Sequence, residues 1–269
     1  MRIAILCALL GAAAPAGARP TVATFDSPAE ALASIVATRP RVIAFGEYHE
    51  VKGAPKVPSA IARFTAELLP RVAAIASEIV VETWVTEGHC GKQEEKVVAQ
   101  VEETTKRPET TEDEVVTLLK RAKAVGLQPN ILQVSCKEYR ALLDENGELD
   151  VVKLLREITI LLQRKTIERM RAAPADHAVL IYGGALHNDV YPRKELRQFT
   201  FARELGRAAG GRYLEVDLYV PEYIELDKQI TSEPWYKSLA AQPRDKTTLV
   251  KRGPTSYIVV FPRTETETH

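Results

Sequence analysis

The stretch from Arg41 to Glu50 (RVIAFGEYHE) constrains the fold more than any other part of the chain. Its first half is a β-branched and aromatic run, which is typical of a buried strand, and the run ends at Gly46. Glu47 and His49 follow at once, and both residue types bind metals or move protons. Ligands of open α/β sheets bind outside the carboxyl ends of the strands. The sequence therefore places reactive groups where a parallel sheet would use them.

The same pattern occurs at two later predicted strands. A second apolar run, 78–82, ends at Glu82, and a third, 178–182, leads through two glycines to His187. Glycine after a strand allows a sharp turn or the close approach of another group. Because the carboxyl ends of parallel strands meet at one edge of a sheet, we expect these side chains to converge with those that follow the first strand.

Predicted strands alternate with predicted helices along the chain. Strands are expected near 41–45, 77–82, 130–135, 178–182, 213–219 and 257–261, and helices near 27–38, 61–69, 93–106, 112–125, 151–171 and 193–208. This alternation favours a three-layer α/β/α fold with a mostly parallel sheet. The helical pair within 93–125 is interpreted as an insertion near the site, and the segment 221–254, rich in proline and charge, is expected to be irregular.

The first residues read as a targeting segment. Arg2 precedes the apolar run 3–14, and small residues at 16–18 follow, which together are typical of a secretory signal peptide. The run is too short for a bilayer-spanning helix; the alternative is a buried N-terminal helix. We expect a signal peptide at 1–18, a single domain at 19–263 and a disordered tail at 264–269. The protein is then exported, to the periplasm or the extracellular space.

Charge and cysteine content narrow the function further. The chain has 36 basic and 36 acidic residues, so no net charge draws it to nucleic acid, and no stable membrane span is predicted. Cys7 lies within the signal peptide, which leaves Cys90 and Cys136. In an oxidising compartment this pair predicts a disulfide, with two free thiols as the alternative.

The candidate site combines two imidazoles with two carboxylates: Glu47, His49, Glu82 and His187. Such a set suits a divalent metal, either zinc, manganese or iron. It also suits chemistry without a metal, in which a histidine deprotonates water and a carboxylate orients it. A glutamate at a buried strand end is expected to have a raised pKa. The chain lacks the Gly-x-Ser-x-Gly and His-Glu-x-x-His motifs and a phosphate-binding glycine loop.

The order of these motifs resembles that of the erythromycin esterase/ChaN-like superfamily, which also includes the TIKI/TraB proteins. The resemblance rests on Gly-Glu-Tyr-His at 46–49, on Glu82 and on Gly-Gly-Ala-Leu-His at 183–187. It extends from about Arg41 to Leu218, and its layout is most similar to the haem-uptake ChaN-like branch. It implies a three-layer α/β/α fold whose site lies at the strand tips.

The resemblance implies several activities. Erythromycin esterase-like members hydrolyse a lactone ester with a histidine-activated water, TIKI/TraB-like members resemble metal-dependent proteases, and ChaN-like members bind haem. The segment 50–55 lacks the second histidine expected of the ChaN-like pattern. This departure favours hydrolysis over haem binding.

Three hypotheses follow, of which the third is a scaffold protein whose site is no longer active. In the first, the protein is an exported hydrolase acting on an ester or amide of a small molecule or peptide. His49 is its general base or first metal ligand, Glu82 orients water or completes the metal shell, and His187 is a second ligand or stabilises an oxyanion. In the second, the protein binds haem, with His49, His187 or Tyr48 as axial ligand. The substrate and the oligomeric state stay open.

Overall fold

The computed structural model describes residues 20–50, 52–87, 90, 100–101, 103, 106–108 and 110–264. Within them, a mixed 8-stranded sheet has the order β1-β7-β8-β6-β2-β5-β3-β4. The strands are β1 Thr21–Phe25, β2 Val42–Glu47, β3 Ala76–Glu87, β4 Gln128–Ser135, β5 Ala178–Gly184, β6 Tyr213–Tyr219, β7 Thr247–Gly253 and β8 Ser256–Val260. The pairs that involve β7 are antiparallel, and the other pairs are parallel. The mostly parallel sheet is thereby confirmed.

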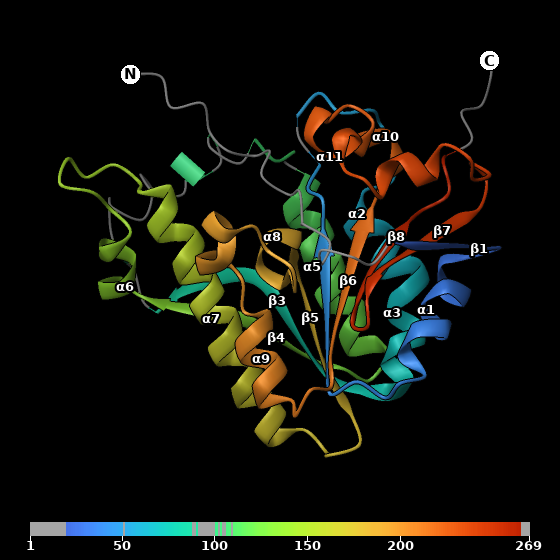
Figure 1. Cartoon of the computed structure of the whole chain (residues 1–269). Helices are drawn as coiled ribbons and strands as arrows, with labels where there is room; N and C mark the ends of the chain where they lie inside the picture. Colours follow the sequence, from blue (N-terminus) through green and yellow to red (C-terminus); the bar gives the residue numbers. More distant parts are fainter. Residues whose placement is uncertain are drawn as a thin grey trace.

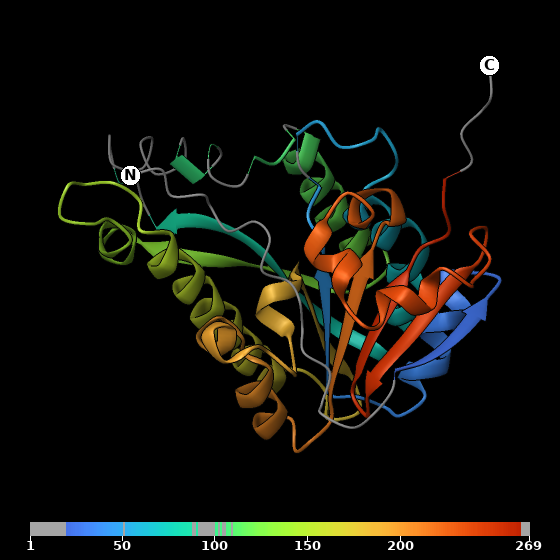
Figure 2. The ribbon, with the colours of Figure 1, turned by 45° about the horizontal axis from the view of Figure 1, so that its top comes forward.

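Helices pack against both faces of this sheet (Figure 1). On one face lie α1 Pro28–Val36, α2 Ala60–Arg63, the π-helical η1 Phe64–Leu68, α3 Leu69–Val72, η2 Ala73–Ile75 and α5 Thr110–Ala124. On the other lie α6 Cys136–Ala141, α7 Val151–Ala172 and α9 Ala202–Ala208. The remaining short helices are α8 Ala185–Asn188, η3 Lys194–Phe199, α10 Pro221–Ile224, α11 Lys228–Ser232 and η4 Tyr236–Leu239. Figure 2 shows α7 and α9 together on their side of the strands.

Polar caps fix where several helices begin. Ser27 accepts a hydrogen bond from the backbone N–H of Glu30 at the start of α1, and Pro28 occupies the first helical position. The Asp150 carboxylate accepts from two backbone N–H groups at the start of α7. These caps satisfy donors that have no partner inside the helix.

Strand β2 lies at the centre of the parallel region, between β5 and β6, and all of its residues are buried. Alternate side chains enter the two apolar cores: Ile43 and Phe45 face α2 and α5, whereas Val42 and Ala44 face α7 and α9. A strand buried on both faces requires the continuous apolar run that the sequence shows. This burial holds the end of β2, and with it Glu47, in a fixed place.

Several sequence-based expectations need correction. The mostly exposed strand β1 was not predicted, and neither was β7 within 221–254, where α10, α11 and η4 also form. The helix expected at 193–208 is broken into η3 and α9, because the backbone at Thr200 is extended and its hydroxyl bonds to the carbonyl of Asp189. Most of the helix expected at 93–106, the signal peptide and most of the tail lie outside the described residues; residues 100, 101 and 103 are described and helical.

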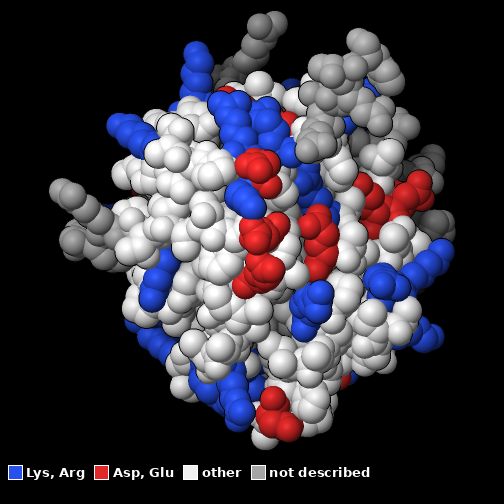
Figure 3. Space-filling model, turned by 90° about the vertical axis from the view of Figure 1, so that its right-hand side faces the viewer, with Lys and Arg blue, Asp and Glu red and all other residues white. Residues whose placement is uncertain are grey.

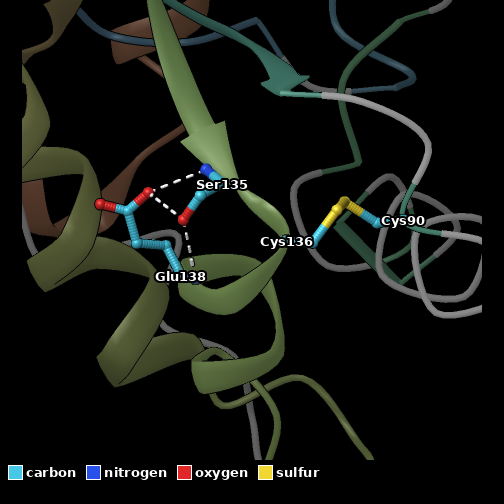
Figure 4. Close-up of a disulfide and its surroundings, with 4 residues drawn as sticks. All are labelled: Cys90, Ser135, Cys136 and Glu138. Carbon is cyan, nitrogen blue, oxygen red and sulfur yellow. Dashed lines mark hydrogen bonds between the residues drawn. A yellow bond between two sulfur atoms is a disulfide. The ribbon is translucent and has the colours of Figure 1, made fainter.

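A disulfide joins Cys90 to Cys136, as the sequence predicted (Figure 4). Cys136 is the first residue of α6, directly after β4, and Cys90 follows the end of β3. Beside it, Ser135 and Glu138 form a capping box, in which each side chain accepts a hydrogen bond from the backbone of the other residue. The disulfide therefore ties the segment after β3 to the carboxyl end of the neighbouring strand.

The surface shows no separation of charge at the β1 end of the sheet. Acidic and basic side chains lie interspersed among uncharged ones on this face (Figure 3), and Lys246 pairs there with Asp26. Among the described residues, no helix combines the length and the apolar character that a membrane span requires.

A charged cluster is buried between the core under α7 and the core under α10. Arg252, which is 2% exposed, pairs with Glu215 and lies 3.2 Å from Asp217 and 3.6 Å from Asp189. One guanidinium thus faces three carboxylates. Burial raises the pKa of Glu215 well above its ordinary value and that of Asp217 to about 7. Burial therefore favours the protonated forms of Glu215 and Asp217.

Removing the cation from this cluster should be costly. We predict that Arg252→Met lowers the free energy of unfolding by about 3–5 kcal/mol, because it leaves buried carboxylates without their counter-charge. Arg164→Met is the control: its side chain is 59% exposed beside Glu138, so the loss should be within about 0.5 kcal/mol. Urea unfolding measures both. Equal stabilities for the two variants would contradict the prediction.

Stability should also depend on pH through Asp217. Its folded pKa is raised to about 7, so the native chain binds this proton more tightly than the unfolded chain does. The resulting stabilisation is full below the unfolded pKa, roughly 4, and is lost as pH rises through about 7. We predict that Asp217→Asn flattens the fall in unfolding free energy between pH 5 and pH 8. The control variant Asp245→Asn, at an exposed position, should leave this fall unchanged. Equal slopes would be the contrary result.

Candidate functional site

Three of the four predicted site residues approach the tip of β5 from its two neighbours and from the turn that follows it. Glu47 ends β2, which pairs with β5 on one side, and Glu82 lies in β3, which pairs with it on the other. His187 lies in α8, directly after β5. His49 follows β2 and completes the set. The convergence expected from the strand ends is therefore observed in the structure.

Glu47 and His49 form a carboxylate–imidazole pair. Oε1 of Glu47 lies 2.6 Å from Nδ1 of His49, and Oε2 accepts a hydrogen bond from the Tyr182 hydroxyl. An ionised carboxylate only accepts, so Nδ1 must carry the proton and Nε2 must carry the lone pair. Glu47 is buried, whereas the His49 side chain is 29% exposed. The pair thus presents a basic nitrogen at the end of the sheet.

A bulge in β3 aims Glu82 at the same place. The pairing of β3 with β4 jumps from Val81 opposite Ile131 to Trp84 opposite Leu132, which leaves Glu82 and its neighbour as extra residues. The ladder with β5 also stops at Val81. Bulges bend a strand and redirect its side chains. Freed from both ladders, Glu82 places Oε2 2.6 Å from the backbone N–H of Gly184, which donates to it.

His187 is held by backbone and hydroxyl groups on the α7 side. Its Nδ1 lies 3.0 Å from the carbonyl oxygen of Phe199 and 2.9 Å from the hydroxyl of Thr159. A carbonyl only accepts, so Nδ1 carries the proton and Nε2 is free of one. Nε2 lies 3.9 Å from Oε1 of Glu82. The break between η3 and α9 supplies this contact, because it turns the Phe199 carbonyl toward the ring.

The site depends on glycine at both tip positions of β5. A Cβ atom at Gly184 would lie 2.7 Å from Nε2 of His49, and one at Gly183 would collide with the Glu82 carboxylate. Real Cβ atoms almost never make contacts this short. The two glycines therefore leave the space in which the imidazole of one strand and the carboxylate of another meet.

The surroundings favour the ionised form of both carboxylates and the neutral form of His187. Burial alone would raise the pKa of Glu47, but His49, Arg107 and the Tyr182 hydroxyl outweigh it, and the pKa is lowered. For Glu82, burial is likewise outweighed by His187 and by other neighbours, so its pKa is also lowered. The raised values expected from the sequence are wrong, because the Arg107 charge and hydrogen-bond donors favour the ionised form of both groups. Burial lowers the pKa of His187, against the opposing effect of Glu82.

Sequence reasoning missed Arg107. Its guanidinium contacts the His49 ring, with Nη2 2.7 Å from Nδ1 and closer to Nε2, and lies 4.0 Å from Oε1 of Glu47. No strand end or glycine motif precedes Arg107, so its sequence position gave no signal. Tyr182 and Thr159 were missed for a similar reason: each supports the site from within a regular strand or helix.

Tyr48 does not join the other candidates. Its hydroxyl donates to Asp227, and its ring packs edge-on against Tyr219, under α10 and α11. His177 directly precedes β5 and therefore lies at the amino-terminal end of that strand, away from the site. His89 lies outside the described residues.

The donors do not fit a metal ion in this arrangement. Within the described ranges, no three His, Cys, Asp or Glu side chains are grouped so that they would hold one. Arg107 already places a positive charge on Nε2 of His49, where a metal would bind. An axial bond to haem iron would need the same nitrogen, or Nε2 of His187, which is 3% exposed and faces Glu82. Zinc, manganese, iron and haem thus remain predictions from the sequence.

Comparison with known proteins adds little on function. No protein-family model matches the chain, and no curated protein matches it. The chain is similar to the solved structure of the type III effector HopBA1, with 9% sequence identity and a TM-score of 0.43 over 95% of this chain and 99% of that chain.

The need for a bare backbone at β5 can be tested by stability. We predict that Gly184→Ala lowers the free energy of unfolding by about 1–3 kcal/mol, because the new methyl group displaces His49. Gly206→Ala in α9 is the matched control: its Cβ would make an ordinary 3.9 Å contact with Tyr213, and alanine favours the helix by about 0.5–1 kcal/mol. Chemical denaturation compares them, and a neutral Gly184→Ala would contradict the close packing.

Proposed function

We propose that the protein is a hydrolase that cleaves an ester or amide with a water molecule activated by His49. The observation that carries the proposal is the 2.6 Å contact between Glu47 and Nδ1 of His49, which fixes the tautomer and leaves Nε2 as a base. A buried carboxylate that orients an imidazole in this way also stabilises the imidazolium formed when the base takes a proton. The resemblance to the erythromycin esterase/ChaN-like superfamily supports the same reaction class.

Glu82 and His187 suit the binding of the attacking water. Oε1 of Glu82 and Nε2 of His187 lie 3.9 Å apart, and both accept hydrogen bonds. One of them can accept one hydrogen of the attacking water, and the other hydrogen then points to Nε2 of His49. With its proton on Nδ1, His187 has no N–H to offer an oxyanion. We therefore assign it to water, with Glu82, and not to the substrate oxygen.

The reaction then needs one proton transfer in each direction. His49 Nε2 takes a proton from water as the water oxygen bonds to the carbonyl carbon, and the carbonyl π electrons move to its oxygen. Collapse of this tetrahedral species re-forms the carbonyl and breaks the bond to the leaving oxygen or nitrogen. That atom receives the proton back from His49, which restores the starting state.

We also propose that the protein is exported. The fold in this proposal is a complete three-layer α/β/α arrangement with a helical insertion near the site. The Cys90–Cys136 disulfide supports export, because disulfides persist in oxidising compartments. We infer that the protein acts in the periplasm or the extracellular space, on a small-molecule or peptide substrate.

Hydrolysis of p-nitrophenyl acetate tests the proposal. We predict that His49→Ala lowers kcat/KM by about 10²–10⁴-fold, the usual contribution of a general base. The control is His177→Ala, which removes a 40% exposed imidazole at the other end of β5 and should leave the rate unchanged. A fully active His49→Ala enzyme would rule out His49 as the base.

A further inference from the structure

Arg107 occupies the nitrogen that the proposed reaction needs. Its Nη2 lies 2.7 Å from Nδ1 of His49 and closer to Nε2, and Nδ1 already donates to Glu47. A guanidinium has donors and no acceptor, so the contact runs from Arg107 to the lone pair of Nε2. While it persists, His49 cannot take a proton from water. The described arrangement is therefore a resting state.

The described ion pairs do not hold the guanidinium tightly. Among the described residues, the carboxylate within ion-pair distance is Glu47, at 4.0 Å, which is the outer limit for such a pair. The Arg107 side chain is 25% exposed, and arginine reaches new partners by rotation about several bonds. None of the described carboxylates forms with Arg107 the bidentate pair that fixes buried arginines.

The charge of Arg107 nevertheless acts across the whole site. It lowers the pKa of Glu47 and of Glu82, although these carboxylates come from strands on opposite sides of β5. A donor with this reach, beside the base and partly exposed, is placed to meet negative charge that develops on a substrate. Donors directed at such charge are among the largest contributors to catalysis of acyl transfer.

We propose that Arg107 caps Nε2 of His49 at rest and becomes the oxyanion donor when a substrate carbonyl displaces it. This inference rests on the proposed hydrolytic function. The carbonyl oxygen takes the N–H that Arg107 had given to His49, and Nε2 becomes free to accept the proton of the attacking water. As the water oxygen bonds to carbon, the carbonyl π pair moves onto the oxygen that Arg107 holds. The same displacement therefore frees Nε2 of His49 to act as the base and places the Arg107 guanidinium at the carbonyl oxygen.

The resting contact can be tested without any substrate. Diethylpyrocarbonate modifies the unprotonated nitrogen of an imidazole, and peptide mass spectrometry gives the rate at each histidine. We expect Arg107→Met to raise the rate at His49 by about tenfold or more, since a hydrogen bond to a charged group is lost. Arg107→Lys should give a smaller increase, and Arg164→Met none. An unchanged modification rate at His49 in Arg107→Met would overturn the proposal that Arg107 caps Nε2.

The oxyanion role is tested with p-nitrophenyl acetate. We expect Arg107→Met to lower kcat by about 10²–10³-fold with little change in KM, as for the loss of one oxyanion donor, and added guanidinium chloride at millimolar concentration to restore part of the rate. An unchanged or higher kcat would overturn this role. If the wild-type chain hydrolyses no ester, the proposed function fails, whereas the modification rates still decide whether Arg107 caps His49.

Discussion

The site depends on the absence of side chains at the carboxyl end of β5. Gly183 and Gly184 leave a bare backbone between two strands that each carry a glutamate, Glu47 at the end of β2 and Glu82 at the bulge within β3. Glu82 reaches this backbone and accepts its N–H, and the His49 imidazole lies where a Cβ atom would otherwise be. Any larger residue at either position would push these groups apart. Packing around His49 and Glu82 therefore requires glycine at both positions.

Ion pairs and hydrogen bonds, as well as apolar packing, hold the turn that carries His187. Asn188 and Asp189 continue the turn that carries His187; Asn188 donates to Asp217, and Asp189 lies beside Arg252. The buried charged cluster therefore anchors the same short helix, α8, whose other side presents the imidazole. A mostly apolar sheet alone would not fix the orientation of such a helix, because apolar contacts have little directionality. Hydrogen bonds and ion pairs supply the direction here.

The sequence allowed the central sheet and four site residues to be predicted for one reason. Strands buried on both faces, such as β2 and β5, need apolar runs, and reactive residues stand out where these runs end. The same reasoning could not find β1, which is mostly exposed, or β7, where Lys251 and Arg252 interrupt the apolar pattern. Nor could it find Arg107, whose place near His49 is set by tertiary structure, or the bulge that redirects Glu82.

The central claim is that both imidazoles present an unprotonated Nε2 to the tip of β5. Long-range ¹H–¹⁵N NMR of the histidine rings tests it most directly, because the chemical shifts of the two ring nitrogens report which one carries the proton. At neutral pH, His49 and His187 should both carry the proton on Nδ1, and the Nε2 signal of His49 should change in Arg107→Met. A proton on Nε2 of either ring would contradict the claim, since that nitrogen could then neither accept a proton nor hold water.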